Sequence, residues 1–375
     1  MHILICRSNP VAPDPRVEKE AVSLTEAGYD VSVIGWDRSA SHPIVEEREN
    51  YKVHRIPIRA SYGMGLGNLT RLLKWQIQLF TWLLAHHKDY DVLHACDFDT
   101  VLPCLAMKLM FGKKLVYDIF DFYPDHLRRT PRLIKNAIRA VDYWIIDHVD
   151  AVILVDDTRR AQIKATSPKR LSVIYNSPQD ISTQLNLYEP SPKGKLRLAY
   201  VGLFQKERGL IEMASVIKKH PEWTLDMAGF GGDEDVIHAA CEGVQNITWH
   251  GVVSYKKALQ LSTKADILFA TYDPVIPNHR YSSPNKIFEA MMLAKPIVVA
   301  SGTNMDLMVL KNEFGIIVSY GNASQLEEAL LQLARDPALR ERLGKNARKA
   351  YETLYGWDIM KLRLQELYSQ ILKYG

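Results

Sequence analysis

Short apolar runs alternate with amphipathic segments along the first half of the chain. Ile3-Leu4-Ile5 predicts a buried strand, and Arg16 to Ala27 predicts a helix whose apolar side chains share one face. Continuous apolar strands between such helices are typical of a parallel sheet covered on both faces. The pattern recurs, with strands expected at 31–35, 53–58, 92–94, 114–117 and 151–155 and helices at 69–87, 99–111, 131–148 and 157–165.

This rhythm breaks between Ser177 and Lys195, where Pro, Ser and Gly cluster as in a linker. A second alternating series follows, with strands expected at 198–202, 224–229, 247–250, 265–270, 296–300 and 315–318. We therefore predict an α/β fold of two doubly wound domains, with ligands where strand carboxyl ends face a cleft. The expected parts are an N-terminal domain (1–177), a linker (178–195), a C-terminal domain (196–355) and a last helix (356–375) that packs back on the N-terminal domain.

Composition excludes several classes of protein. At 375 residues the chain is too long for one typical core, and 47% apolar with 24% charged residues is ordinary for a soluble globular protein. A net charge of +4 is too small to indicate nucleic acid. No stretch approaches the roughly 20 apolar residues of a spanning helix. We expect a cytoplasmic protein, attached at most to the inner membrane surface, whose cysteines are reduced core residues.

The stretch from Tyr272 to Ala300 carries the most specific chemistry. Ser283-Pro284 predicts a helix start, because the hydroxyl can cap free N–H groups and proline suits the first helical position. The N–H groups of Asn285 and Lys286 would then bind an anion such as phosphate. Glu289, one turn later, is placed to accept hydroxyl hydrogen bonds. Together these features indicate a nucleotide-sugar site; the alternative is a capped helix with a Lys286–Glu289 pair.

A second phosphate site is predicted at the start of the C-terminal domain, in YVGLFQKERGL. Gly202 ends the strand there, and Lys206 and Arg208 supply cations before the next helix. Arg208 is preferred because a guanidinium makes two hydrogen bonds to a diphosphate. The later strand ends contribute Gly229, which permits close approach of either a ligand or a neighbouring helix, and Val252, whose backbone can meet a base edge.

The chain resembles the retaining glycosyltransferases of GT-B fold, in particular family 4. The resemblance spans nearly the whole chain, in DPRVEKEAVSLTEAGYDVSVIG, DVLHACDFDT, YVGLFQKERG, LDMAGFGG, ITWHGVV and YSSPNKIFEAMMLAKPIVVA. It implies a nucleotide-sugar donor in the C-terminal domain, an acceptor in the N-terminal domain, and neither metal nor other cofactor. It also implies that Arg208 binds the diphosphate, Glu289 the ribose hydroxyls, and Ser282, Ser283 and Asn285 the phosphate and sugar.

Two positions depart from the family pattern. Tyr281 stands where a first glutamate is common, and Phe120 stands at the expected position of a histidine in the N-terminal domain. Asp121 is then the candidate for contacting the sugar or acceptor, with a loop or cap role as the alternative. Catalysis would rest on holding both substrates together and neutralising the diphosphate with Arg208, Lys286 and the helix N-terminus.

Two further side chains are expected to contact the acceptor. Arg16 follows the loop after the first strand, and Asp97 follows another strand end. Both would therefore face the predicted cleft. For Arg16 the alternatives are a donor phosphate contact or a solvated position at the helix start.

Residues 52–88 indicate contact with an anionic membrane surface. The segment has basic residues and no acid before Asp89, and Leu69 to Leu84 is apolar around most of its helical circumference, with Trp75, Phe80 and Trp82. Basic residues beside exposed aromatic side chains suit such a surface. The alternative is a helix buried between the sheet and a neighbour.

The predicted function is therefore transfer of a sugar, with retention, from a nucleoside diphosphate to a glycan or lipid-linked acceptor in cell-surface polysaccharide or glycoconjugate assembly. One alternative is a sugar-nucleotide epimerase of the same fold, which would need acid and base carboxylates in the cleft. Another is a non-catalytic nucleotide-sugar or glycan-binding subunit, which is suggested by Tyr281 and Phe120 at the two departing positions.

Overall fold

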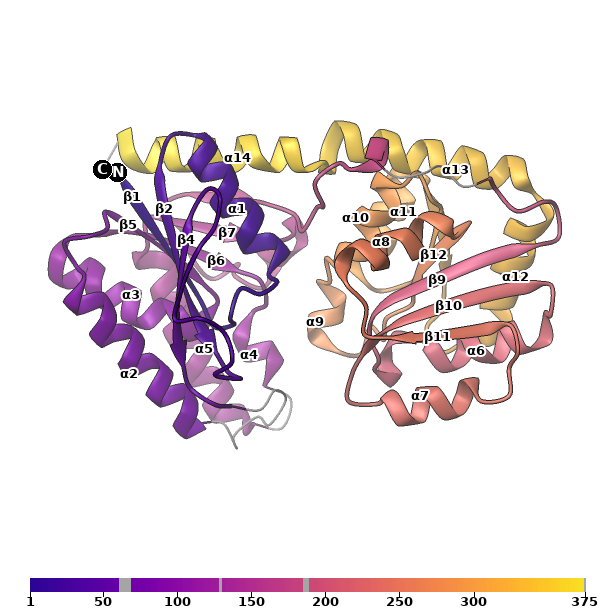
Figure 1. Cartoon of the computed structure of the whole chain (residues 1–375), viewed down its shortest axis with the longest axis horizontal. Helices are drawn as coiled ribbons and strands as arrows, with labels where there is room; N and C mark the ends of the chain where they lie inside the picture. Colours follow the sequence, from indigo (N-terminus) through magenta and orange to yellow (C-terminus); the bar gives the residue numbers. More distant parts are fainter. Residues whose placement is uncertain (61–68, 128–129, 185–188, 374–375) are drawn as a thin grey trace. The chain divides into compact units, whose positions relative to one another are not determined.

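The computed structural model describes residues 1–60, 69–127, 130–184 and 189–373, which divide into two compact units (Figure 1). The N-terminal unit comprises Met1–Tyr175 with Met360–Gly375, and the C-terminal unit comprises Asn176–Ile359. Residues 185–188 of the expected linker and 61–68 of the basic segment lie outside the described residues.

The N-terminal unit is built on an eight-stranded sheet in the order β3-β4-β2-β1-β5-β6-β7-β8. All neighbours are parallel except β3 and β4. The chain order reverses between β1 and β5, so the loops after these two strands diverge at the carboxyl edge of the sheet. The strands are β1 (His2–Arg7), β2 (Asp30–Asp37), β3 (Val45–Glu47), β4 (Lys52–Pro57), β5 (Val92–Cys96), β6 (Lys114–Ile119), β7 (Ala151–Leu154) and β8 (Leu171–Val173).

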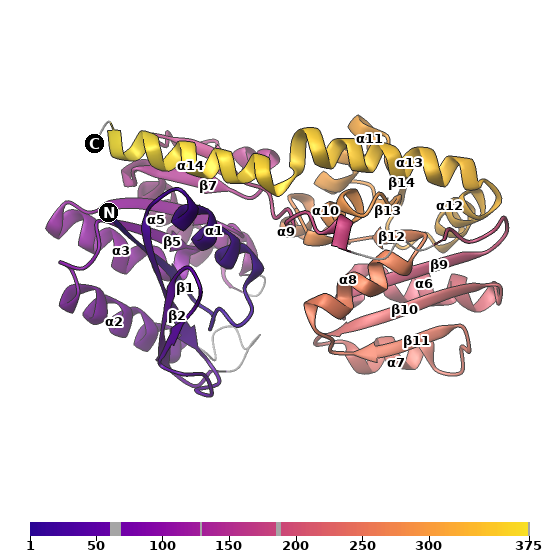
Figure 2. The same ribbon diagram turned by 45° about the horizontal axis from the view of Figure 1, so that its top comes forward.

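Helices cover both faces of this sheet because strand residues alternate between them. Leu4 and Cys6 of β1 point into a core shared with the helices α2, α3 and α5. On the other face lie α1 and the last helix, α14, which contact each other (Figure 2). The bounds are α1 (Pro15–Glu26), α2 (Leu69–Ala85), α3 (Phe98–Phe111), α4 (Tyr123–His126), α5 (Arg132–His148) and α14 (Trp357–Lys373).

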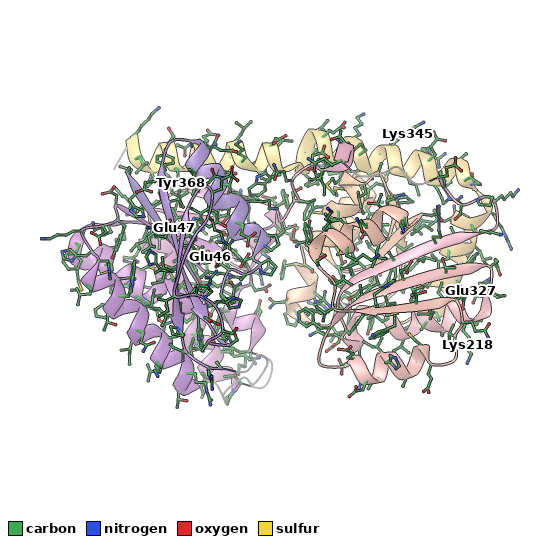
Figure 3. The ribbon with its side chains drawn as sticks, in the orientation of Figure 1. Glu46, Glu47, Lys218, Glu327, Lys345 and Tyr368 are labelled. Carbon is green, nitrogen blue, oxygen red and sulfur yellow. The ribbon has the colours of Figure 1, made fainter. Side chains whose placement is uncertain are left out.

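Helix α14 begins in the C-terminal unit and packs on α1 and β5 of the N-terminal unit. Lys361 forms an ion pair with Glu26, and the Gln365 amide donates to the Ser23 carbonyl (2.9 Å). Tyr368, labelled in Figure 3, is fully buried, and its hydroxyl lies 2.8 Å from Nδ1 of His94. The last helix thus belongs to the N-terminal unit.

The C-terminal unit has a six-stranded parallel sheet in the order β11-β10-β9-β12-β13-β14. Its order reverses between β9 and β12, so this unit also has a switch point. The strands are β9 (Leu196–Leu203), β10 (Trp223–Phe230), β11 (Ile247–Gly251), β12 (Ile267–Ala270), β13 (Ile297–Ala300) and β14 (Gly315–Val318). The helices are α6 (Leu210–Lys219), α7 (Glu234–Cys241), α8 (Tyr255–Lys264), α9 (Pro277–Arg280), α10 (Asn285–Met292), α11 (Asn304–Asn312), α12 (Ala323–Arg335) and α13 (Pro337–Ala350).

The predicted α/β class with two doubly wound sheets is confirmed, and so are the principal strands. Three local predictions are wrong. The short strands β3 and β8 were not expected, and the expected helix at 157–165 is a 3-10 helix over Asp157–Ala161. Helix α10 begins at Asn285 with Pro284 at its N-cap, and no side chain caps it. The loop before it contains α9, because Pro277 provides a helical first residue.

Helix α2 differs from the expectation of exposed aromatic side chains. Trp75 is fully buried, and Phe80 and Trp82 pack partly buried against the core. The apolar residues that α2 does expose are aliphatic: Leu69, Leu73, Ile77 and Leu84. In the described part of the chain, no helix has the length and apolar character needed to cross a membrane.

Asp142 on α5 provides a test of carboxylate burial in this core. It is fully buried, accepts a hydrogen bond from the Tyr117 hydroxyl (2.9 Å), and burial raises its pKa to about 7. The folded state therefore binds this proton more tightly than the unfolded chain. The resulting stability is fully present below about pH 4 and is lost as the pH rises to about 7.

We therefore expect Asp142→Asn to stabilise the protein by roughly 1 kcal/mol or more at pH 8, and by less at pH 4.5, in thermal unfolding. Asp89→Asn, at an exposed position, is the control and should change neither value. An equal gain at both pH values would contradict this account of Asp142.

Candidate functional site

The loops that leave β9 and β12 meet at the switch point of the C-terminal sheet. The loop after β9 holds the 3-10 turn Lys206–Arg208, followed by Gly209 in a left-handed conformation (φ +68°). A Cβ atom on Gly209 would come within 2.2 Å of the Thr271 hydroxyl, so glycine is required here. This close approach fixes Arg208 beside the segment that leads from β12 to α10.

Lys286, the second residue of α10, is buried with its ammonium group beside the carboxyl end of β9. Nζ lies 3.3 Å from the centre of the Tyr200 ring, and a Cβ atom on Gly202 would be 3.4 Å from it. Nζ has no hydrogen-bond partner among the described residues. Burial, together with the nearby charge of Arg208, lowers the pKa of Lys286 well below its usual value. An anion bound here would restore the charged form.

Arg208 also lies over a tyrosine ring. Its guanidinium carbon is 3.9 Å from the centre of the Tyr272 ring, and its Nε donates a long hydrogen bond to Gln205 (3.4 Å). Tyr272 in turn packs against His279. Lys206 points elsewhere: it is half exposed and lies 3.9 Å from Asp233. The structure therefore brings Arg208 and Lys286 together, each supported by an aromatic face.

The other residues expected on α10 surround these cations. Glu289 is buried and accepts a hydrogen bond from Tyr255, the first residue of α8. Ser282 is half-buried and Asn285 is exposed. The Ser283 hydroxyl is buried and unpaired within the described residues, so it does not cap the helix as predicted. It stays available for a ligand.

The glycines and Val252 lie at the carboxyl edge of the same sheet. Gly229 pairs with Gly202 across β10 and β9, and a Cβ atom on Gly229 would be 1.8 Å from the Gly202 carbonyl oxygen. The close approach at Gly229 is therefore to a neighbouring strand, which was neither of the predicted alternatives. Val252 follows β11 and is 74% exposed.

In the N-terminal unit, Asp97 lies at the other switch point. Its carboxylate pairs with Arg7 at the end of β1 (2.5 Å) and accepts the Phe120 N–H (2.9 Å). Asp97 has a left-handed backbone (φ +68°) at the N-cap of α3, but its side chain does not cap that helix. Burial raises the pKa of Asp97 to about 7 despite the opposing charge of Arg7.

Arg16 is buried, so a solvated position at the helix start is wrong. Its guanidinium donates to Asp118 (3.0 and 3.1 Å) and to the Ile174 carbonyl (2.7 Å), and it pairs with Glu20 (3.1 Å). Burial would raise the pKa of Asp118, but Arg16 outweighs it and the pKa is lowered. His94, Cys96 and Asp118 bring possible metal ligands within 4.8 Å of one another. Because Arg16 already neutralises Asp118, this group suits an ion-pair network.

Asp121 and Phe120 follow β6 at the same edge. Asp121 is half exposed and pairs with Arg159 (2.9 Å). The Phe120 ring receives two cations, with the guanidinium carbons of Arg7 and Arg16 at 4.1 and 4.8 Å from its centre. Phenylalanine at this position therefore covers a pair of arginines, and Asp97, Asp121 and Arg7 are the polar groups beside it.

Sequence reasoning missed the tyrosines that support the donor cations. Tyr200 and Tyr272 stand two residues before and two residues after the ends of strand patterns that were recognised. The strand that contains Tyr200 could be recognised from its apolar pattern. The packing of α10 that brings Lys286 to Tyr200 could not. Arg7 was missed for the same reason, since its partner Asp97 follows another strand. Glu20 was missed although its partner Arg16 lies one turn away on α1.

The two halves of the chain match two sequence profiles. Residues 12–177 match "Glycosyl transferase 4-like domain", and residues 188–350 match "Glycosyl transferases group 1". Among relatives, the chain is 22% identical to the glycogen synthase of Mycobacterium tuberculosis over 74% of this chain and 68% of that protein. It is 32% identical to the capsular polysaccharide glycosyltransferase CapM of Staphylococcus aureus over 26% of each chain.

Solved structures share the fold over the whole chain. Sucrose-phosphate synthase of Thermosynechococcus elongatus superimposes with a TM-score of 0.81 at 16% identity, covering all of both chains. Anabaena HepE in complex with UDP and glucose has a TM-score of 0.74 at 15% identity, covering 99% of this chain and all of that one. The architecture is therefore GT-B, which confirms the predicted fold.

The two profile matches define the class of protein as a glycosyltransferase. The chain belongs to the family 4-like glycosyltransferases of GT-B fold. This membership favours the predicted transferase over an epimerase or a non-catalytic subunit.

A substitution of Lys286 can show whether this residue binds a ligand or only stabilises the fold. Removing a buried, unpaired ammonium group abolishes its desolvation cost, so Lys286→Met should raise the melting temperature of the free protein by a few degrees. The same change should abolish stabilisation by UDP, because the diphosphate loses a cation. Lys218→Met, at an exposed lysine of the same unit (Figure 3), should alter neither quantity. Undiminished stabilisation by UDP would remove Lys286 from the donor site.

Proposed function

We propose that the protein transfers a sugar, with retention of anomeric configuration, from a nucleoside diphosphate sugar to a glycan or lipid-linked acceptor, without a metal ion. The acceptor belongs to cell-surface polysaccharide or glycoconjugate assembly. The observation that carries the proposal is the pair of cations at the β9–β12 switch point. Lys286 and Arg208 lie over tyrosine rings, and Lys286 lacks a hydrogen-bond partner among the described residues.

A diphosphate satisfies this arrangement. Arg208 binds it with two hydrogen bonds, while Lys286 and the N–H groups at the start of α10 neutralise the remaining charge. These groups also stabilise the negative charge that develops as the sugar–phosphate bond breaks. Since the protein supplies two cations there, the leaving group needs no divalent ion. Ser282, Ser283, Asn285 and Gly202 complete the phosphate and sugar contacts, whereas Lys206 is directed toward Asp233 instead.

The nucleoside lies beyond the diphosphate. Glu289 accepts hydrogen bonds from the ribose hydroxyls, and Tyr255 holds its carboxylate in place. Val252, which is exposed, and Gly229, near the end of β10, border the base. HepE and trehalose-6-phosphate protein from E. coli were solved with UDP or a UDP-sugar, so uridine nucleotides are the first donors to test.

The acceptor is proposed to bind at the carboxyl edge of the N-terminal sheet. Asp97 and Asp121 provide carboxylates for its hydroxyl groups, with Asp121 the more exposed. Arg16 contributes indirectly, by supporting the Phe120 ring, since its described hydrogen bonds go to protein groups. A front-face reaction lets the leaving diphosphate accept the acceptor proton, so these aspartates hold the acceptor in place.

We also propose that residues 52–88 contact an anionic membrane surface and that the enzyme works at the inner face of the cell membrane. In support, α2 contains Arg71 and Lys74 and no acidic residue, and its exposed apolar side chains are aliphatic. A lipid-linked acceptor would be met at such a surface.

Donor binding is testable by thermal shift with UDP-, GDP- and ADP-sugars. We expect stabilisation by one nucleotide class, and its reduction by at least about tenfold in apparent affinity in Arg208→Ala and Glu289→Ala. Lys218→Met is the matched control in the same unit. Undiminished binding by both site variants would refute the proposed donor site. Product anomeric configuration by NMR and activity in EDTA test retention and metal independence separately.

A further inference from the structure

The outer surface of one helix layer in the N-terminal unit is unusually apolar. Among the described residues this unit has sixteen exposed large hydrophobic side chains, and twelve lie on α2, α3 and α5. Single exposed hydrophobics are common, but a group of this size on one layer marks an interaction surface. We call it the helix-layer patch; it comprises Leu69, Leu73, Ile77, Leu84, Leu102, Leu109, Met110, Phe111, Leu133, Ile134, Val141 and Trp144.

The patch is one surface because its three helices cover the same face of the sheet. Residues of α2, α3 and α5 share a single buried core, and α2 packs beside α3 (Figure 1). Their outward positions therefore belong to the same side of the unit. On α5 the exposed residues Leu133, Ile134, Val141 and Trp144 fall within about 100° of the helical circumference. Leu133 is 84% exposed, more than a position with a packing role requires.

The charge of this layer favours an anionic partner. The three helices carry the basic residues Arg71, Lys74, Lys108, Arg132, Lys135 and Arg139, against the acids Asp99, Asp142 and Asp147. Two of these basic residues, Lys108 and Arg139, form ion pairs with Asp150 and Asp125 outside the three helices. Of these acids, Asp142 is fully buried and Asp99 is partly buried at the first turn of α3. Lys74 and Arg132 are both exposed. Two copies of the patch would bring like charges together, which opposes self-association.

We propose that the helix-layer patch docks on an anionic lipid bilayer. The contact extends the one proposed for 52–88 to α3 and α5, so it rests on the proposed function only for the identity of a lipid-linked acceptor. Leucine, methionine and tryptophan side chains enter the interfacial region, and the lysines and arginines meet the lipid phosphates. Neutral bilayers lack the second of these attractions.

Sedimentation of the full chain with lipid vesicles tests the proposal. We expect binding to phosphatidylcholine vesicles that contain phosphatidylglycerol, weakened by salt, and much less binding to phosphatidylcholine alone. The paired variants Leu133→Ser with Ile134→Ser, and Leu109→Ser with Met110→Ser, should each weaken binding about tenfold or more. Lys74→Gln with Arg132→Gln should weaken binding to anionic vesicles only.

The matched control is Leu307→Ser with Leu310→Ser on α11 of the C-terminal unit, where the side chains are 56% and 69% exposed. This variant should bind vesicles like the natural protein. Equal binding to neutral vesicles, or patch variants that bind unchanged, would overturn the proposal. So would concentration-dependent dimerisation that the patch variants abolish, since a second copy would then cover the patch. Thermal shift by the donor nucleotide, measured on each variant, should stay unchanged, so a failed donor site is recognised separately.

Discussion

The proposed donor site depends on two cations, Arg208 and Lys286, that lie close enough for the charge of Arg208 to lower the pKa of Lys286. Like charges at close range repel, and burial penalises an ammonium group further. Tyrosine faces beneath Arg208 and Lys286 offset part of this cost. The remaining free-energy cost would favour ligand binding, because a bound diphosphate would offset it. Binding of an anion at the point where β9 and β12 diverge would therefore stabilise the two cations.

At the N-terminal switch point, in contrast, the buried cations are paired with carboxylates. There, Arg7 and Arg16 are paired with Asp14, Asp97 and Asp118 before any ligand arrives. Such a network is costly to break and holds the loops after β1 and β5 in a fixed arrangement. His94 connects it to Tyr368 on α14, so the last helix of the chain supports the same edge. A fixed network at the proposed acceptor side would suit a reaction that depends on positioning.

How far the sequence predicted this structure follows from the range of the interactions involved. Apolar periodicity is local, so the strands around Ile3 and Leu198 and both doubly wound sheets were predictable. Lys286 and Arg208 were found because each lies in a local strand–turn–helix pattern. The roles of Tyr200 and Gly229 depend on register between strands far apart in the chain, which one sequence does not encode visibly. The capping prediction at Ser283 failed because Pro284 itself occupies the N-cap.

The position of the apolar surface bears on how substrates are supplied. In α2, hydrophobic residues occur all round the helix, so sequence periodicity alone did not distinguish a buried helix from a membrane contact. The structure separates the two: Trp75, Leu79 and Leu83 face the core, and Leu69, Leu73 and Ile77 face outward. Burial against the core is therefore confirmed for one side of the helix, and membrane contact stays a prediction for the other. Since α3 and α5 expose apolar side chains on the same layer, the outward face is a property of the unit and not of one segment.

A nucleotide-sugar is soluble, whereas a lipid-linked acceptor is confined to a bilayer. If the acceptor is lipid-linked as proposed, the apolar, basic face of the N-terminal unit would bring the enzyme to the substrate that cannot diffuse to it.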